Sequence, residues 1–246
     1  MGVVTECIDN VCVPVQEVDL QFGCLDDPIR ELISGETGTA EIILMSLGDN
    51  QPVPGIQISQ CNSLFDRGCE SPVATAVSDA DGRVTLPIPP GFRGHLFTEG
   101  QNGLARELFY FFPPPDPERP VTLSIPFFVA NLAQVVAAGA VIGVAMVPDT
   151  AVVFFRAEDC QGEPLTDVVL SVSPSIDESQ PVYLSPTDLP DSTLSATGAT
   201  GRGALVNIPV GNATITAVHK DHGVIFEKTI IADANSIISI RVMPSM

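Results

Sequence analysis

Short apolar runs that alternate with polar residues, and that end at turn residues, fill most of this chain of 246 residues. In the run 83–88, Arg-Val-Thr-Leu-Pro-Ile, every second side chain is a large apolar one. Such alternation places one face of a strand in a core and the other in water. The 22 prolines and 20 glycines supply the turns between runs. We therefore predict an all-β fold.

The expected strands form two groups of seven, the number found in a β-sandwich of the immunoglobulin-like kind. The first group is 39–47, 55–61, 73–78, 83–88, 94–98, 104–112 and 121–125. The second group is 151–158, 167–173, 193–197, 203–208, 212–219, 224–231 and 237–242. A polar insertion at 174–191 separates the second and third strands of the second group. We predict two tandem seven-stranded sandwiches of the immunoglobulin-like or prealbumin-like kind.

The two groups share sequence landmarks, which indicates an internal duplication. Pro52-Val53-Pro54-Gly55-Ile56 matches Pro164-Leu165-Thr166-Asp167-Val168, and the Ile-Pro-x-Gly run at 88–91 matches the one at 208–211. The second landmark is offset further than the first, so the extra length is an insertion in the second copy. The expected parts are an acidic cysteine-containing arm (1–38), a first sandwich (39–126), an apolar helical linker (127–149) and a second sandwich (150–246).

The linker contains an uncharged segment, Phe127 to Val147, that is long enough to cross a bilayer. Asn131, Gln134 and two glycines interrupt it, and neither flank carries a basic anchor. We therefore expect a short helix buried between the two modules and no transmembrane span.

Phenylalanines gather on either side of a proline-rich stretch at 113–117; they are Phe109, Phe111, Phe112, Phe127 and Phe128. One interpretation of the cluster 109–128 is an exposed patch that recruits a subunit or a ligand. The other is a core beneath the linker helix, which would make the two modules a rigid pair. We favour the second interpretation.

The chain is strongly acidic, with 11 basic and 30 acidic residues and a formal charge of −19. Binding to nucleic acid needs clustered Lys and Arg, so we expect no nucleic-acid partner. An anionic membrane surface would repel the chain for the same reason. No signal peptide follows Met1 in this sequence. The partner classes that remain are proteins, through self-association or contact with other surface proteins, and polysaccharides.

Six cysteines are present without the paired spacing of a zinc site. Cys61 and Cys69 flank a short polar loop and suit a local disulfide. Cys7 and Cys12 could close a similar small ring, which leaves Cys24 and Cys160 for a long-range bridge. Six cysteines allow fifteen pairings, and only the first of these has direct support. We infer an oxidising compartment, and hence a secreted or cell-surface protein.

One turn resembles the start of a calcium loop, because Asp79 and Asp81 alternate before Gly82. The next alternate position is Arg83, which supplies no hard oxygen ligand. Asp and Gly also favour tight turns by themselves. We prefer the turn, and Asp79 and Asp81 are the calcium candidate.

The order of a strand, x-P-[VL]-x-[GD]-[IV], a small-residue turn and I-P-x-G resembles the carboxypeptidase-regulatory-like module, a member of the transthyretin-like (prealbumin-like) sandwich group. The resemblance covers about 39–126 and 150–243. The tandem arrangement, with Asp159-Cys160 and the other cysteines, resembles surface proteins of myxobacteria and related bacteria. Such modules serve as spacers, accessory domains and binding units, so the resemblance implies a fold and no particular reaction.

A related sandwich group, the intradiol dioxygenases, holds iron with two tyrosines and two histidines. Tyr110, Tyr183, His219 and His222 occur here in that order, but the two histidines are expected to straddle a turn. The serine-nucleophile motif G-x-S-x-G is absent from the sequence. A metal-dependent enzyme that uses Tyr183, His219 and His222 is therefore the alternative hypothesis.

The leading hypothesis is a non-enzymatic extracellular or cell-surface protein with no catalytic residue and no cofactor. It acts as a structural or binding unit, and a subclass is a self-assembling subunit whose arm 1–38 adds a strand or a disulfide to a neighbouring copy. A carbohydrate- or protein-binding accessory module is the other non-enzymatic reading.

Overall fold

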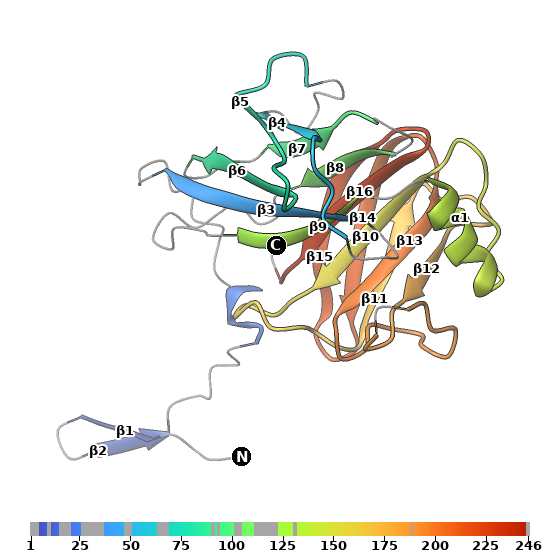
Figure 1. The fold of residues 1–246 in the computed structure, drawn as a ribbon. Coiled ribbons are helices and arrows are strands. Elements are labelled where there is room, and N and C mark those ends of the chain that lie inside the picture. The colour runs from blue at the N-terminus through green and yellow to red at the C-terminus, as the bar shows by residue number, and fades with distance from the viewer. Residues whose placement is uncertain are drawn as a thin grey trace.

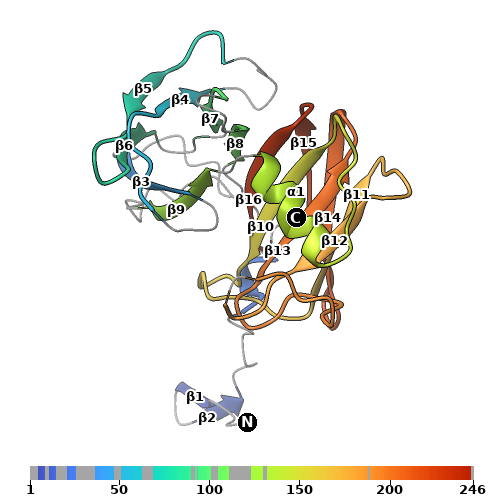
Figure 2. The same ribbon diagram turned by 45° about the vertical axis from the view of Figure 1, so that its right-hand side comes forward.

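The computed structural model describes residues 5–8, 11–14, 21–25, 37–46, 51–62, 69–89, 92, 94–100, 105–110, 123–129, 132–187 and 189–244. These residues form sixteen strands, one α-helix and one 3-10 helix, so the predicted all-β class is confirmed. Figures 1 and 2 show two sandwiches: the first is coloured blue to green and the second yellow to red.

The first sandwich has seven strands in two layers. One layer has the order β6-β3-β9, and the other is the four-strand part β8-β7-β4-β5 of a larger sheet. Ile42, Leu44, Ile58, Leu86 and Phe109 belong to the core between the layers. The strands are β3 (Gly38–Ser46), β4 (Gln57–Cys61), β5 (Ala74–Val77), β6 (Arg83–Ile88), β7 (His95–Thr98), β8 (Arg106–Tyr110) and β9 (Leu123–Val129).

The second sandwich also has seven strands. The order β12-β13-β10-β16 forms one layer, and β11-β14-β15 forms the other. Leu170, Ile215, Phe226 and Ile238 belong to its core. The strands are β10 (Ala151–Ala157), β11 (Val168–Ser173), β12 (Gln180–Tyr183), β13 (Arg202–Ile208), β14 (Gly211–His219), β15 (Gly223–Ala232) and β16 (Ser236–Val242).

The two modules have the same strand order except for one strand. In each module the first and last strands pair in parallel, β3 with β9 and β10 with β16. The second, fifth and sixth strands form β4-β7-β8 in one module and β11-β14-β15 in the other. Only the third strand changes layers, because β5 pairs with β4 whereas β12 pairs with β13.

One hydroxyl side chain makes the same pair of backbone hydrogen bonds at equivalent places in the two modules, and we call this arrangement the node. In the first module the Ser78 hydroxyl donates to Val53 O (2.8 Å) and accepts the Ile56 N–H (2.9 Å). In the second module the Thr197 hydroxyl donates to Leu165 O (2.8 Å) and accepts the Val168 N–H (3.0 Å). The landmark prolines seen in the sequence therefore precede equivalent strands, β4 and β11.

The two modules share one sheet, which the sequence did not predict. Strand β8 of the first module pairs in parallel with β16 of the second, which gives the eight-stranded order β12-β13-β10-β16-β8-β7-β4-β5. Phe97, Leu108 and Tyr110 of the first module belong to the same core cluster as the second module's interior.

Two expectations about the middle of the chain are corrected. Strand β9 continues to Val129, and the helix α1 spans only Leu132–Val141. The helix is not buried between the modules. Through Val135 it covers the outer face of the second module's layer, while Val141 is 85% exposed (Figure 1). No helix in the described ranges has the length and apolarity needed to cross a membrane.

A third correction concerns the second module. The strand expected at 193–197 is absent, because 192–196 form turns and bends around the Asp191 carboxylate, which accepts the N–H and the hydroxyl of Thr193. The strand β12 lies instead within the stretch 174–191, which was expected to be a polar insertion.

The described parts of the arm are not simply extended. Residues 5–14 include a two-stranded hairpin of β1 (Thr5–Ile8) and β2 (Val11–Pro14). Gly23–Leu25 form the 3-10 helix η1, and Cys24 within it is joined to Cys160 of the second sandwich by a disulfide.

Candidate functional site

The arm is fastened to the second sandwich by a disulfide between Cys24 and Cys160. The Cys160 N–H donates to the Gln21 carbonyl oxygen at 3.0 Å. The Cys24 sulfur also lies 3.1 Å from the carbonyl oxygen of Pro244. Residues 21–25, the start of the loop after β10 and the end of the described chain therefore meet at one place. We call residues 21–25 with Cys160 the clasp.

An aromatic contact supports the clasp. Phe22 is buried and stacks on His222 with ring centroids 3.6 Å apart, and its ring lies 4.9 Å from that of His219. The two imidazoles are 5.1 Å apart. The Asp221 N–H donates to His219 Nδ1 at 3.2 Å, so this nitrogen acts as an acceptor. Burial, and then the neighbouring His222, lower the pKa of His219.

The histidines straddle the turn between β14 and β15, as the sequence predicts. Lys220, between them, forms an ion pair with Asp167 (2.6 Å). The hydrogen bond from Lys220 lowers the pKa of the Asp167 carboxyl and raises that of the lysine.

The tyrosines of the enzyme hypothesis have packing roles elsewhere. The Tyr183 hydroxyl accepts the Leu170 N–H (3.3 Å) inside the second core, and burial raises the pKa of this tyrosine. The Tyr110 hydroxyl accepts the Ile231 N–H (3.3 Å) across the junction between the modules. Among the described residues, no cluster of three His, Cys, Asp or Glu side chains is arranged to hold a metal ion.

The calcium candidate Asp79 closes a turn. Its Oδ1 accepts the N–H groups of Asp81 (2.9 Å) and Arg83 (2.8 Å). Asp159 forms the same arrangement, with Oδ1 accepting from Gln161 and Glu163. Both aspartates are used as in a tight turn, in which the side chain of Asp accepts N–H groups that follow it.

The remaining cysteines follow the expected pairing where it is described. Cys61 and Cys69 form a disulfide. Cys7 and Cys12 face each other in the register of β1 and β2, and their side chains lie outside the described part of the chain. Of the five phenylalanines in the cluster 109–128, only Phe109 has a described side chain. It lies in the first module's core and not beneath α1.

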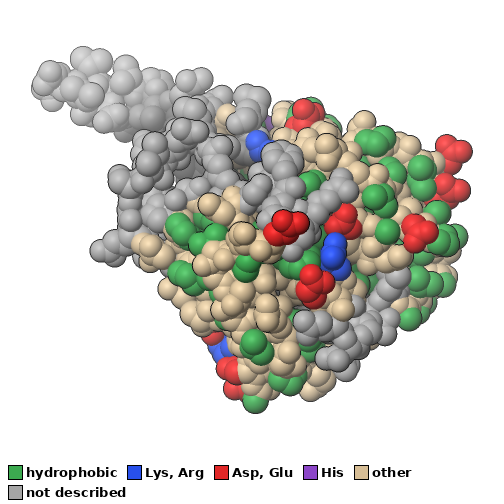
Figure 3. All heavy atoms as spheres, turned by 90° about the horizontal axis from the view of Figure 1, so that it is seen from above, with side chains coloured by type: hydrophobic (Ala, Val, Ile, Leu, Met, Phe, Trp, Pro, Cys, Tyr) green, Lys and Arg blue, Asp and Glu red, His purple; other side chains and the backbone are tan. Residues whose placement is uncertain are grey.

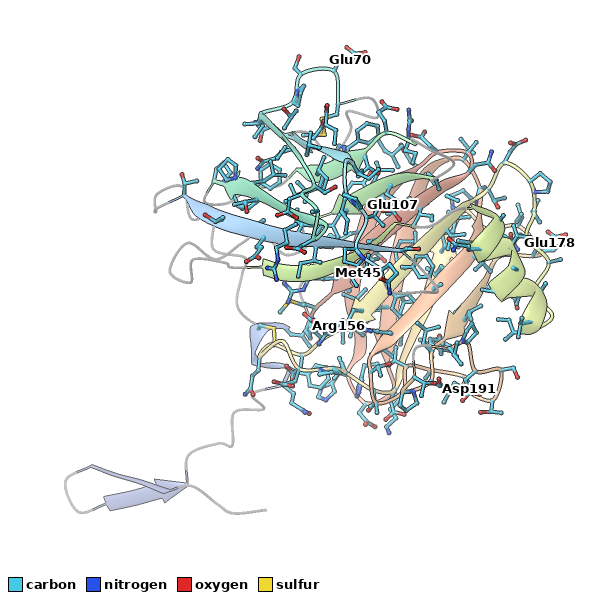
Figure 4. The ribbon with its side chains drawn as sticks, in the orientation of Figure 1. Met45, Glu70, Glu107, Arg156, Glu178 and Asp191 are labelled. Atoms are coloured by element: carbon cyan, nitrogen blue, oxygen red, sulfur yellow. A yellow bond between two sulfur atoms is a disulfide. The ribbon has the colours of Figure 1, made fainter. Side chains whose placement is uncertain are left out.

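Charged groups reinforce the junction and the clasp. Arg106 of β8 forms an ion pair with Asp233 of the second module (3.1 Å), and its guanidinium lies 5.1 Å from the centre of the Phe97 ring. At the end of β10 the buried Glu158 carboxylate accepts from Arg241 and pairs with Arg156 (3.0 Å). Figure 4 shows Arg156 toward the clasp end of the molecule and Glu107 of β8 within the first sandwich.

The junction is the feature that the sequence analysis missed. Its signal was present: Leu108-Phe109-Tyr110 and Ile237-Ile238 are uninterrupted apolar runs, which are typical of strands buried on both faces. Elsewhere the acidic residues are dispersed, and in Figure 3 they are scattered among neutral side chains over the described surface.

No family model and no curated protein matches the sequence. Among solved structures, the Bacillus anthracis TIE protein is similar over 84% of this chain and 34% of its own, with 13% identity and a TM-score of 0.28. The chain thus spans about a third of that protein's length. The shaft pilin SpaA from Lactobacillus rhamnosus GG is similar over 86% of this chain and 99% of its own, with 13% identity and a TM-score of 0.28. A streptococcal ancillary pilin is similar over 82% and 61%, with 12% identity and a TM-score of 0.27. Scores of this size do not place the chain in the family of any of these proteins.

Proposed function

We propose that the chain is a non-enzymatic structural subunit of an extracellular or cell-surface assembly. The observation that carries the proposal is the continuous eight-stranded sheet, which joins the two sandwiches into one unit through β8 and β16. Modules joined only by a linker turn freely, whereas backbone pairing across five residue pairs fixes their orientation.

The sulfur chemistry supports a location outside the cell. Disulfides persist in oxidising compartments, and Cys24–Cys160 and Cys61–Cys69 are both formed. The long bridge fastens the arm to the second sandwich, so the covalent links and the shared sheet serve the same end, a fixed arrangement of parts.

The residues considered above as metal ligands or catalytic groups support a structural role, because each contributes to the fold. Asp79 closes a turn, Tyr183 accepts a strand N–H, and the two histidines pack on Phe22. We extend the proposal to membership of the carboxypeptidase-regulatory-like group, supported by the repeated Ser78 and Thr197 nodes beside the landmark prolines.

Sedimentation velocity over a wide range of protein concentration tests the assembly role. We expect the weight-average mass to rise with concentration, and to rise further in salt, because salt screens the repulsion between copies of charge −19. Labelling of intact producing cells with a membrane-impermeant amine reagent tests the location. A chain that stays monomeric under all conditions, or that is labelled only after lysis, would contradict the proposal.

A polysaccharide partner is the second candidate, favoured by one surface. The outer face of β11-β14-β15 carries hydroxyls in cross-strand rows, with Ser171 opposite Thr216 and Thr214 bonded to Thr229 (3.1 Å). Glycan-array binding that is lost in Thr214→Val and Thr216→Val would support this candidate, and absence of binding to every glycan would remove it.

A further inference from the structure

Open sheet edges are where one chain can add a strand to another, and folded proteins protect such edges. The three larger sheets end at six strands: β12, β5, β11, β15, β6 and β9. A proline, a charged residue, or a side chain that bonds to the strand backbone can protect such an edge.

Five of the six edges carry such a device. Three contain proline, which removes a backbone donor: Pro181 in β12, Pro87 in β6 and Pro126 in β9. Strand β11 has two N–H groups bonded by side chains, those of Val168 to Thr197 and Leu170 to Tyr183. Strand β15 carries the adjacent charges Glu227 and Lys228, and its Ile231 N–H is bonded to Tyr110.

Strand β5 carries no proline and no charge. Its sequence is Ala-Thr-Ala-Val; its last residue, Val77, is 58% exposed, and Val73, just before the strand, is 54% exposed. Pairing with β4 extends past the strand, because the Val73 N–H donates to Gln60 O (2.8 Å). At the other end the Ser78 N–H donates to Ile56 O (2.9 Å). The Ser78 N–H faces β4, and backbone groups alternate in direction along a strand, so the N–H groups of Thr75 and Val77 face the open side. The Val73 N–H, which also bonds to β4, departs from this alternation at the start of the strand.

The hairpin β1–β2 pairs with none of the three larger sheets in the described part of the chain. Its two strands are hydrogen-bonded to each other as a separate two-stranded sheet, and such a hairpin is at most marginally stable by itself. Strand β2 ends in Pro14, which lacks an N–H, so β1 is the better donor of backbone bonds.

The two ends of the molecule carry these complementary elements. Figures 1 and 2 both place β5 at the opposite end of the molecule from the clasp and the hairpin, and Figure 4 shows Glu70, beside β5, at that far end. This placement lets the hairpin of one copy reach the β5 edge of another in a head-to-tail arrangement. A contact of this kind between different surfaces repeats from copy to copy and builds a ring or an open chain of subunits, according to the rotation between neighbours.

We propose that β1 of one copy adds to the open edge of β5 in the next copy, so that a second copy of this chain is the partner of the β5 edge. This inference rests on the proposed assembly function, and it names the two surfaces that the assembly uses.

Two full-length variants and one truncation test the interface by sedimentation velocity. Thr75→Pro removes an N–H that faces the open side, so β5 still pairs with β4 but no longer accepts a strand. Loss of that hydrogen bond alone corresponds to about tenfold weaker association. Val77→Asp places a negative charge at the edge, and the matched control is Val141→Asp, an exposed valine on α1 that is remote from β5. Deletion of 1–14 removes the donor and keeps the clasp.

The mixing result is decisive. Thr75→Pro keeps a donor and lacks an acceptor, whereas the truncated chain keeps an acceptor and lacks a donor. At a protein concentration between the wild-type dissociation constant and the tenfold higher value for Thr75→Pro, each alone is expected to stay monomeric, and the mixture is expected to form heterodimers that grow no further. Unchanged thermal midpoints of Thr75→Pro and Val77→Asp show that both fold.

The outcomes separate this inference from the proposed function. If the wild type associates, and Thr75→Pro, Val77→Asp and the truncated chain associate as it does, the assembly stands and this interface is wrong. If the wild type is monomeric at every concentration, the assembly function itself fails. If Val141→Asp weakens association as much as Val77→Asp does, charge and not edge pairing is responsible, and the inference is overturned.

Discussion

The two described disulfides differ greatly in the length of chain that they close, and this difference predicts unequal contributions to stability. Cys24–Cys160 joins residues 136 positions apart, whereas Cys61–Cys69 joins residues 8 apart. In the chain-entropy model, the long bridge restricts the unfolded chain by about 5 kcal/mol and the short one by about 2.5 kcal/mol.

Side-chain packing reduces this difference in stability between the two bridges, because it adds to the contribution of the short one. Cys61 and Cys69 are buried, so replacing them by alanine also removes packed sulfur atoms, whereas Cys24 and Cys160 are half-buried. We expect the double variant Cys24→Ala, Cys160→Ala to lose about 1.5–2.5 kcal/mol more than Cys61→Ala, Cys69→Ala.

Urea unfolding followed by far-UV circular dichroism measures both losses, with the remaining disulfide intact in each variant. A single transition with an unchanged slope is required for the comparison. If the short-bridge variant is the less stable of the two, the clasp does not restrict the unfolded chain, and the reasoning from loop length is refuted.

Three further predictions concern single residues. Gly201→Ala is expected to lower the free energy of unfolding by about 3 kcal/mol, because its φ is +65° and a Cβ there would lie 2.2 Å from Ala157 O. Gly223→Ala has a similar φ of +71° but open space around the Cβ, so it should cost about 1 kcal/mol. Equal losses in urea unfolding would contradict the clash at Gly201. The pKa of His219 is lowered in the folded state, so the unfolded chain binds the proton more readily and stability falls as the pH drops below about 6.5; the fall between pH 7.5 and 5.5 should be smaller in His219→Gln, and an identical fall would refute this. Asp79→Ala should cost about 1–2 kcal/mol through two lost amide hydrogen bonds, Asp81→Ala about 0.5 kcal/mol or less, and calcium should leave the thermal midpoint unchanged; a midpoint that rises with calcium in the wild type but not in Asp79→Ala would favour the metal site.

Local patterns in the sequence predicted the elements whose causes are local. The alternation at 83–88 became β6, with its apolar side chains buried and the others exposed. The Cys61–Cys69 bridge closes a short loop, so sequence distance alone indicated it. The landmark prolines were informative because those before β4 and β11 stand beside equivalent hydrogen bonds in the two modules.

Elements with distant causes could not be predicted in this way. Strand β12 contains Pro181 and lies in a polar stretch, and only its pairing with β13 makes it a strand. The run 193–197 contains β-branched residues typical of strands, but Thr197 uses its hydroxyl in the node. The uncharged segment 127–147 combines the end of β9 with a short helix, so its length did not correspond to one element.

The clasp brings the start of the sandwich region and the end of the described chain together, since the Cys24 sulfur lies 3.1 Å from Pro244 O. Tension applied between residue 20 and residue 244 would pass through the Cys24–Cys160 bridge and the adjacent ends of β10 and β16, where the Glu158 N–H bonds to Val242 O (2.9 Å). The first sandwich lies between the two bridged cysteines in the sequence, so it would bear none of this tension. Reduction of the Cys24–Cys160 bridge would make the first sandwich bear the tension together with the second. The oxidation state of these two cysteines would therefore decide whether the molecule behaves as a short tether or as an extensible one.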